Sequence, residues 1–381
     1  MTDFDCVIIG AGPAGASLAQ TLARAGHSVV MIERRTGTRH DVVETLPPAA
    51  MGLARQLLDL SDGTTPSRGT ISAWGADAPL IQDYFFTSEG CGLCVNRAVF
   101  DDDLRNRAQD VGATLWQGAK LHTANRTVEK DGWLCEIEVD GELRTLNASY
   151  IVDATGRQAA LGKIFGIQRD KSDPLFAYAL EFSAQTAPEA VGFARVESCS
   201  YGWWYCNAIP DTDRFVAVVQ VDIDAAEAIQ ASHRDGFLNL LADTKLTLQF
   251  LNSVAASPIG RIRGAYAGHA RNRSIGPKRF LAVGDALQAF DPLSSQGVWR
   301  AMASGVQAGQ LLSYALANAK LNTDQHAFLD RYNQSQAEAW GQYSNSYSQF
   351  YTAEHRWSDH SFWSRRSGPE FNQSQTLRKA P

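Results

Sequence analysis

Three glycines and one acid near the N-terminus have the types and spacing of a dinucleotide site. Gly10, Gly12 and Gly15 form a Gly-x-Gly-x-x-Gly motif directly after the apolar run 6–9, and Glu33 closes a second apolar run. Gly10 permits a tight turn, Gly12 lets the backbone approach a pyrophosphate, and Gly15 lets the following helix pack on the strand. Unpaired N–H groups at the helix N-terminus attract phosphate, and the carboxylate can accept hydrogen bonds from a ribose. The stretch predicts a bound dinucleotide.

Two later stretches join an apolar strand to glycine in a similar way. The first is Asp153-Ala-Thr-Gly156-Arg157, after an apolar run. The second is Gly284-Asp285, which leads to Pro292-x-x-Ser295-x-Gly297 and then to a helix predicted at 298–318. Glycine and proline at these positions favour sharp turns.

The elements that must position these motifs are a parallel sheet and an insert. Apolar runs at 6–9, 28–32, 150–153 and 280–283 predict buried strands that lie together in one parallel sheet. Residues 175–222 favour long antiparallel strands. A nucleotide-binding unit therefore stands at both ends of the chain, and ligand sites tend to lie where such domains meet.

Composition excludes some classes of function. The chain has 381 residues and a net charge of −6, which argues against nucleic acid as a partner. No apolar run approaches the roughly 18 residues that span a bilayer, and the acidic leader is unlike a signal peptide. Cys91 and Cys94 are the one close cysteine pair and have no nearby histidine, so we expect no metal site. They are either a redox dithiol or two buried thiols in a reducing cytoplasm, the expected location.

In their order along the chain, the three motifs resemble FAD-dependent monooxygenases of the p-hydroxybenzoate hydroxylase fold, over roughly residues 1–320. The resemblance implies an α/β chain with a Rossmann-like FAD-binding domain and its parallel sheet, an inserted antiparallel-sheet substrate domain, and C-terminal helices. The implied FAD-binding domain is discontinuous and comprises residues 1–70, 95–165 and 270–320. The substrate domain would comprise 71–94 and 166–269, and a C-terminal helical segment and tail 321–381.

The resemblance also implies contacts with FAD. Asp285 would bond the ribityl chain, the turn 292–298 would lay N–H groups beside the flavin ring, Arg97 would reach the cofactor, and the backbone of Leu121 would meet adenine. A helix cap for Asp285 and a surface ion pair for Arg97 are the alternatives. The residues expected to bind the cofactor are Gly10, Gly12, Pro13, Ala14, Gly15, Glu33, Arg34, Arg97, Leu121, Asp153, Gly156, Gly284, Asp285, Pro292, Ser295, Gln296, Gly297 and Val298.

Further stretches resemble the branch of this superfamily that contains flavin-dependent tryptophan halogenases. They are Glu44-Thr-Leu-Pro-Pro and Trp204-Tyr-Cys-Asn-Ala-Ile209-Pro210, an imperfect version of the halogenase motif Trp-x-Trp-x-Ile-Pro. Halogenases also need a lysine before the second domain, whereas the first lysine here is Lys120. The same branch includes maturation flavoproteins of the LodB and GoxB type. These act on a tryptophan of an amino-acid oxidase precursor to build cysteine tryptophylquinone, and the sequence resembles that group.

By this resemblance the chemistry is oxygen transfer from a C4a-(hydro)peroxyflavin to an electron-rich ring, which the cofactor performs while the protein excludes water. Asp291 and Glu44 are candidate catalytic bases. The alternative for Asp291 is a turn residue before proline, and those for Glu44 are a FAD contact or a helix N-terminus. Trp203, Trp204 and Tyr205 either line a substrate cavity or pack within the sheet. The spacing of Tyr343, Tyr347 and Tyr351 puts them on one helix face, which favours a core position.

Several functions stay open from the sequence. The expected substrate is tryptophan in the precursor protein of an amino-acid oxidase; the alternatives are a small aromatic metabolite, halogenation without the usual lysine, reduction of prenyl chains, and a flavin-binding chaperone. Electrons would come from NAD(P)H bound transiently or from a separate flavin reductase. The sequence shows one dinucleotide unit and does not choose between these donors.

Overall fold

The computed structural model describes residues 2–37, 43–60, 64–86, 88, 90–127, 131–171, 173–184, 192–274, 276–318 and 325–367. The expected tail after residue 368 lies outside this part of the chain.

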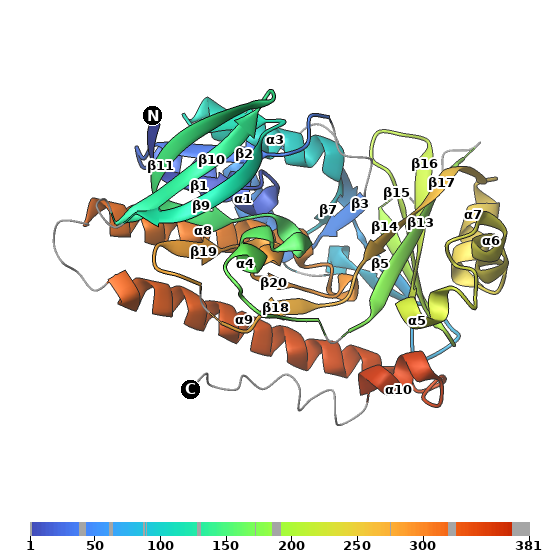
Figure 1. The fold of residues 1–381 in the computed structure, drawn as a ribbon. Coiled ribbons are helices and arrows are strands. Elements are labelled where there is room, and N and C mark those ends of the chain that lie inside the picture. Colours follow the sequence, from blue (N-terminus) through green and yellow to red (C-terminus); the bar gives the residue numbers. More distant parts are fainter. Residues whose placement is uncertain are drawn as a thin grey trace.

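A seven-stranded sheet with a parallel centre carries the glycine motifs (Figure 1). Its strand order is β8-β2-β1-β11-β10-β9, and β19 pairs with the end of β11. The strands β1, β2, β8, β11 and β19 run parallel, so the predicted sheet of residues 6–9, 28–32, 150–153 and 280–283 is confirmed. The strands are β1 (Thr2–Ile9), β2 (Val29–Glu33), β8 (Thr114–Gln117), β9 (Lys120–Thr127), β10 (Gly132–Val139), β11 (Glu142–Asp153) and β19 (Phe280–Ala282).

Helices cover one face of this sheet. Side chains of alternate strand residues such as Cys6 and Ile8 point to that face and pack against Leu18, Leu104 and Met302 of three helices. The helices are α1 (Pro13–Arg24), α3 (Arg97–Asp110) and α8 (Gly297–Ala317). This packing holds the N-termini of α1 and α8 at the same sheet.

A second seven-stranded sheet, almost wholly antiparallel, forms the right half of the molecule in Figure 1. Its order is β17-β13-β16-β15-β14-β5-β6, and only β14 and β5 pair in parallel. Short helices cover its outer side: α5 (Ile223–Ala226), α6 (Arg234–Ala242) and α7 (Leu246–Ser253). The strands are β5 (Gly69–Ala73), β6 (Leu80–Asp83), β13 (Leu175–Ser183), β14 (Phe193–Cys199), β15 (Gly202–Ala208), β16 (Arg214–Asp222) and β17 (Ser257–Tyr266).

Two small sheets connect the large ones. One has the order β3-β7-β4 and the other β12-β18-β20. Their strands are β3 (Val43–Leu46), β4 (Thr64–Ser67), β7 (Gly92–Asn96), β12 (Arg169–Asp170), β18 (Ala270–Asn272) and β20 (Gln288–Ala289); two short helices are α2 (Met51–Leu57) and α4 (Ala160–Ile164).

Two C-terminal helices complete the expected fold class. The long α9 (Gln325–Ala353) runs along one side of the molecule past both halves and ends near α10 (Ser361–Ser367) (Figure 1). Tyr343, Tyr347 and Tyr351 are at most 3% exposed, so their predicted core position is confirmed. Within the described ranges, no helix combines the length and apolarity that crossing a bilayer requires.

Candidate cofactor and substrate site

The glycine-rich turn between β1 and α1 has the shape that its sequence predicts. Gly10 has a φ of +106°, and a Cβ there would lie 2.3 Å from the carbonyl oxygen of Ala154. A Cβ on Gly15 would lie 2.1 Å from the carbonyl oxygen of Gly10. At Gly12, by contrast, a Cβ would meet no protein atom within 4 Å, so the turn leaves open space where a pyrophosphate is expected. Glu33 accepts hydrogen bonds from the backbone N–H groups of Ala11 (3.1 Å) and Arg35 (2.9 Å), which fixes the acid beside the turn.

The helices α1 and α8 run parallel to each other. This follows from two glycines of α8, which contact α1 in the same order along both helices. A Cβ on Gly305 would lie 2.2 Å from the carbonyl oxygen of Ala14, and one on Gly309 would lie 2.7 Å from Cβ of Thr21. Both N-termini therefore lie on the same side of the helix pair. At 1.5 Å per residue, the N-terminus of α8 extends about 10 Å beyond that of α1. Two positive helix ends at this offset suit a ligand with a pyrophosphate and a second electron-rich group.

The second glycine motif ties the turns together. Asp153 is fully buried, and its carboxylate accepts hydrogen bonds from the N–H groups of Thr155 and Gly162 (both 3.0 Å). Because both oxygens are engaged, Asp153 holds the turn and does not present a carboxylate to a cofactor. Arg157 donates to the carbonyl oxygen of Phe290 (2.7 Å) and lies 3.4 Å from Oδ2 of Asp285, so this motif is linked to the third.

Asp285 also borders a cavity of about 230 Å³ between η4 (Gly284–Ala286), α8 and α9. A row of amides forms one wall: Gln288 donates to Gln336 (3.1 Å), and Gln336 donates to Gln307 (2.7 Å). Ligand pockets usually exceed about 300 Å³, so this cavity has room for part of a cofactor only.

Arg97 and Glu44 meet where β3 and β7 lie side by side. Arg97 is 8% exposed and donates to both oxygens of Asp101 (2.8 and 2.9 Å), while its third nitrogen lies 3.5 Å from Glu44. The alternative of a surface ion pair is therefore wrong for Arg97, because its pair with Asp101 is buried on both sides. The side chain of Glu44 is 39% exposed, so one candidate base does reach solvent.

The residues 203–205 do not share one face. Side chains alternate along β15, so Trp204 points to the outer side, where its ring packs on Phe237 at 5.0 Å with no exposed surface. Trp203 points inward, is 1% exposed and donates from Nε1 to the hydroxyl of Tyr351 (3.0 Å). Both tryptophans are core residues here, so of the two alternatives packing within the sheet describes them and a place in a substrate cavity does not. The hydroxyl of Tyr205 lies 3.0 Å from that of Thr45, next to Glu44.

Asp291, the other candidate base, lies inside the protein. It is 1% exposed; Oδ1 accepts from the N–H of Leu293 (2.8 Å) and Oδ2 from the hydroxyl of Tyr351 (2.9 Å). Burial, followed by repulsion from Asp173, raises the pKa of Asp291 to about 7. Because both oxygens face protein atoms, Asp291 does not touch a substrate in this structure; it caps the turn η5 (Pro292–Ser294) that leads into α8.

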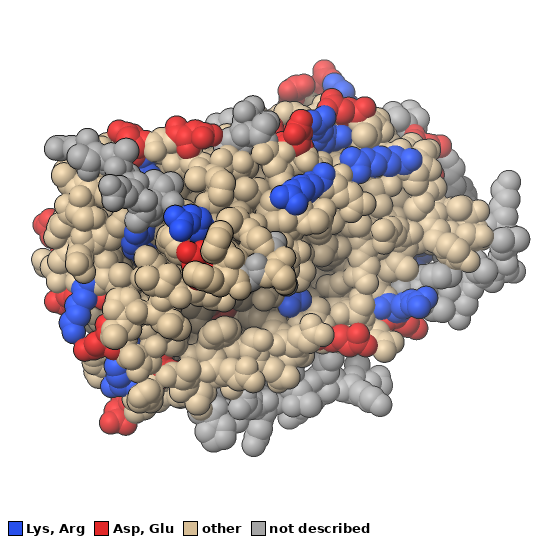
Figure 2. Space-filling model, turned by 180° about the vertical axis from the view of Figure 1, so that it is seen from behind, with Lys and Arg blue, Asp and Glu red and all other residues tan. Residues whose placement is uncertain are grey.

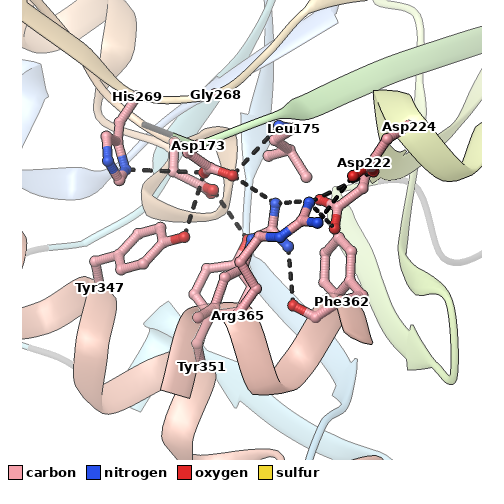
Figure 3. Close-up of polar contacts among 12 residues, drawn as sticks. Asp173, Leu175, Asp222, Asp224, Gly268, His269, Tyr347, Tyr351, Phe362 and Arg365 are labelled. Carbon is pink, nitrogen blue, oxygen red and sulfur yellow. Dashed lines mark hydrogen bonds and ion pairs between the residues drawn. The ribbon is translucent and has the colours of Figure 1, made fainter. Parts of the chain in front are cut away.

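Figure 3 shows a charged cluster around Asp173 and Asp222 that the sequence did not reveal. Tyr351, which lies in this cluster, connects it to Asp291. Arg366 of α10 is fully buried and bonds both Asp173, from the segment before β13, and Asp222 at the end of β16 (2.7 Å). Tyr347 donates to Asp173 (3.2 Å), and His269 lies 3.8 Å from it. Burial lowers the pKa of His269, which favours the neutral imidazole. No local spacing could reveal this cluster, because its members are far apart in the sequence; only the tyrosine stripe gave a sign of it.

The remaining predicted residues are Leu121, Arg34 and those of the bend before α8. Leu121 is half-buried on β9, and Arg34 is exposed just after β2. Ser295 has a φ of +48°, which makes the sharp bend before α8, and a Cβ on Gly297 would meet no atom within 4 Å. The bend therefore leaves open space at the N-terminus of α8, next to Gln296 and the buried Val298.

The surface shows mixed charge. On the face in Figure 2, basic and acidic side chains stand singly or in mixed groups around a broad uncharged area that is hollowed in the middle. In the part of the chain that the structure describes, three or more histidine, cysteine or acidic residues nowhere gather as metal ligands would.

Comparison with known proteins places these features in context. The sequence model of the FAD binding domain family matches residues 3–343. The FAD-dependent oxidoreductase LodB of Marinomonas mediterranea is 26% identical over 377 residues, which cover 96% of this chain and 97% of LodB. Among solved structures, the myxobacterial chondrochloren halogenase CndH aligns with a TM-score of 0.85 at 24% identity, over 98% of this chain and 89% of its own. The peptidyl tryptophan dihydroxylase QhpG aligns with a TM-score of 0.71 at 24% identity, over 97% and 79%.

Proposed function

This chain belongs to the FAD binding domain family and is a FAD-dependent oxidoreductase, and from that premise we propose that it adds oxygen to a tryptophan side chain of a partner protein. The likeness to LodB, which covers nearly the whole of both chains, carries the proposal. QhpG, which shares the fold, is described as essential for tryptophylquinone cofactor biogenesis and supports it. The substrate we propose is the precursor protein of an amino-acid oxidase that matures to contain cysteine tryptophylquinone.

The residues present fit FAD. The open space at Gly12 and Gly297, at two parallel helix N-termini, suits a pyrophosphate and a ring that gains negative charge. Glu33 would hold the ribose of the adenosine half, and Asp285, with one side on the cavity, would hold the ribityl chain. When bound and reduced, FAD would supply the two electrons that activate dioxygen, so that one oxygen atom is transferred to the ring and the other leaves as water.

The chain's own groups orient the reactants and handle a proton. Arg97 lies 3.5 Å from Glu44, and the exposed carboxylate of Glu44 is able to take the proton that a tryptophan ring releases after oxygen addition. Tyr205 and Thr45 form a hydrogen-bonded wall beside it. Asp291 positions the turn at the start of α8 and, from inside the protein, fixes the direction of its N–H groups.

The other functions have less support. Halogenation has a structural relative in CndH, but no lysine occurs among residues 1–119, where halogenases carry the catalytic one. A small-aromatic hydroxylase would fit the same fold and is separated from our proposal by experiment. We also propose that electrons come from NAD(P)H or from a separate reductase; anaerobic bleaching of the flavin by NADH or NADPH alone would identify the first.

The direct test is co-expression with the precursor of a tryptophylquinone oxidase from the same genome. Mass spectrometry of the precursor should find one tryptophan heavier by one or two oxygen atoms. Glu44→Gln, matched for FAD content, should lower this yield at least tenfold, about 1.4 kcal/mol in the barrier. An unmodified precursor, together with NAD(P)H consumption stimulated by a free aromatic compound, contradicts the proposal.

A further inference from the structure

A compact group of apolar side chains stands exposed on the second sheet, away from the motifs described so far. Leu80 and Ile81 on β6 are 70% and 60% exposed, and Phe85 and Phe86 on the following turn are 80% and 85% exposed. The two phenylalanine rings lie edge to face with centroids 5.4 Å apart. We call these four residues the β6 patch. Clustered exposure of this kind marks surfaces that bind proteins, whereas single exposed apolar residues do not.

The patch coincides with an open sheet edge. The strand β6 is the last of its sheet and pairs only with β5 among the described strands. The residues Leu80, Ile81 and Gln82 of this strand are all exposed, so the strand is covered on neither face. Edge strands are usually protected by lysine, proline or a bulge, and Leu80-Ile81-Gln82-Asp83 has no lysine or proline. Among the described strands none pairs with the outer edge of β6, and the backbone N–H and C=O groups of such an edge fit an extended chain.

The β6 patch is continuous with the candidate site. Asp83 pairs with Gly69, and Ser67, two residues earlier, pairs with Gly92 at the start of β7. At about 3.3 Å per residue, β7 leads from there to Arg97 over roughly 17 Å. A chain held at β6 therefore has its neighbouring residues within reach of the exposed Glu44.

We propose that β6 binds an extended, apolar segment of the protein substrate as an added antiparallel or parallel strand, with Phe85 and Phe86 taking its side chains. This inference rests on the proposed function, since it names where the precursor protein docks. Backbone pairing would supply affinity, and the distance to Arg97 would select which tryptophan enters the site.

A fluorescein-labelled dodecapeptide of alternating valine and threonine around one tryptophan is the probe, titrated into the full-length FAD-loaded protein by fluorescence anisotropy. Saturable binding should weaken at least tenfold in Phe85→Ser/Phe86→Ser. The matched control Leu143→Ser removes a side chain of 64% exposure from the other sheet and should bind like the wild type. N-methylation of alternate peptide bonds along one edge of the probe should abolish binding. FAD content and melting temperature verify that each variant is folded.

The same variants separate this inference from the function on which it rests. Tenfold weaker modification of the co-expressed precursor by Phe85→Ser/Phe86→Ser supports both. Equal modification by the variant overturns docking at β6 and leaves the proposed function standing. Peptide binding that depends on the patch, with no oxygen added to any tryptophan, supports docking and contradicts the function. Absence of saturable binding overturns the inference. It is also overturned if light scattering shows that the wild type is a dimer and the double variant a monomer, because β6 would then bind a second copy of the chain.

Discussion

At the scale of single residues, Asp291 shows how burial couples stability to pH. Its pKa of about 7 in the folded protein lies above the ordinary value of 3.8, so between these pH values the folded chain keeps a proton that the unfolded chain releases. The stabilisation is complete below pH 3.8 and is lost as pH rises through about 7.

We therefore expect Asp291→Asn to flatten the fall in melting temperature between about pH 5.5 and 8, by roughly a few degrees. Asparagine keeps an oxygen for the N–H of Leu293 and an N–H for the hydroxyl of Tyr351. Differential scanning fluorimetry measures the effect. Asp59→Asn, at a carboxylate whose side chain is 78% exposed, should keep the wild-type slope; a parallel slope in Asp291→Asn would refute the assignment.

Cys94 should not act as one half of a redox pair with Cys91. Burial first, and then Glu44, raises the pKa of its thiol to about 12, and Asn207 donates to its sulfur (3.3 Å). The thiolate is the reactive form, so Cys94 should stay unlabelled by iodoacetamide at about pH 8 while the exposed Cys91 reacts. Peptide mass spectrometry reads each site. Rapid labelling of Cys94, or a disulfide with Cys91 in air, would show that the dithiol interpretation is right.

At the scale of elements, the close contact of α1 and α8 decides where both helix N-termini lie. Gly305→Ala places a Cβ 2.2 Å from a backbone oxygen of α1, so we expect a loss of about 2 kcal/mol in unfolding free energy and weaker FAD retention. Gly341→Ala on α9 is the matched control, because its Cβ meets no atom within 4 Å. It should stabilise the protein by about 0.5–1 kcal/mol, since alanine is the better helix residue. Urea unfolding measures both, and equal effects would contradict the packing argument.

The elements differ in how far the sequence predicts them. The parallel strands and the glycine turns were predictable, because buried apolar runs and steric demands at Gly10 and Gly15 are local properties. The face on which Trp204 lies was not, because period-two alternation fixes relative but not absolute orientation. The small sheet β3-β7-β4 was also missed, since its three strands come from separate polar or mixed stretches.

At the scale of the whole molecule, one buried cation of α10 joins the C-terminal helices to the ends of the neighbouring strands β13 and β16. Arg366→Met leaves the buried Asp173 without its arginine and Asp222 with only the partly exposed Arg365, so we expect a loss of about 3–5 kcal/mol. Part of this loss should return as pH falls and Asp222, whose pKa is already raised by burial, takes a proton. The adjacent Arg365 pairs with Asp222 from a side chain that is 38% exposed, so Arg365→Met should cost less than about 1 kcal/mol. If chemical unfolding shows a similar loss of unfolding free energy in the two variants, α10 acts through packing alone.

The candidate site also contains residues that the sequence predicts and residues that it does not. The turns that local motifs form, from Gly10 to Glu33 and from Gly284 to Gly297, could be predicted, whereas the contacts of Asp291 within the second could not. The cluster of Asp173, His269 and Arg366 could not, because the fold alone makes these residues neighbours. Its discovery changes the interpretation of Asp291, from a group that meets the substrate to one that holds a turn from within.

The bonds of Arg366 span 193 and 144 positions of the chain, and this separation matters while the protein is being made. The ribosome releases every strand of both large sheets before α10 is synthesised. Until then Asp173 and Asp222 lack Arg366 and stay in contact with water. The inner sheet face around Leu175 and Trp203 is likewise bare until α9 and α10 emerge. Translation therefore passes through an interval in which a nearly complete nascent chain exposes apolar surface, the condition under which chaperones bind and aggregation begins.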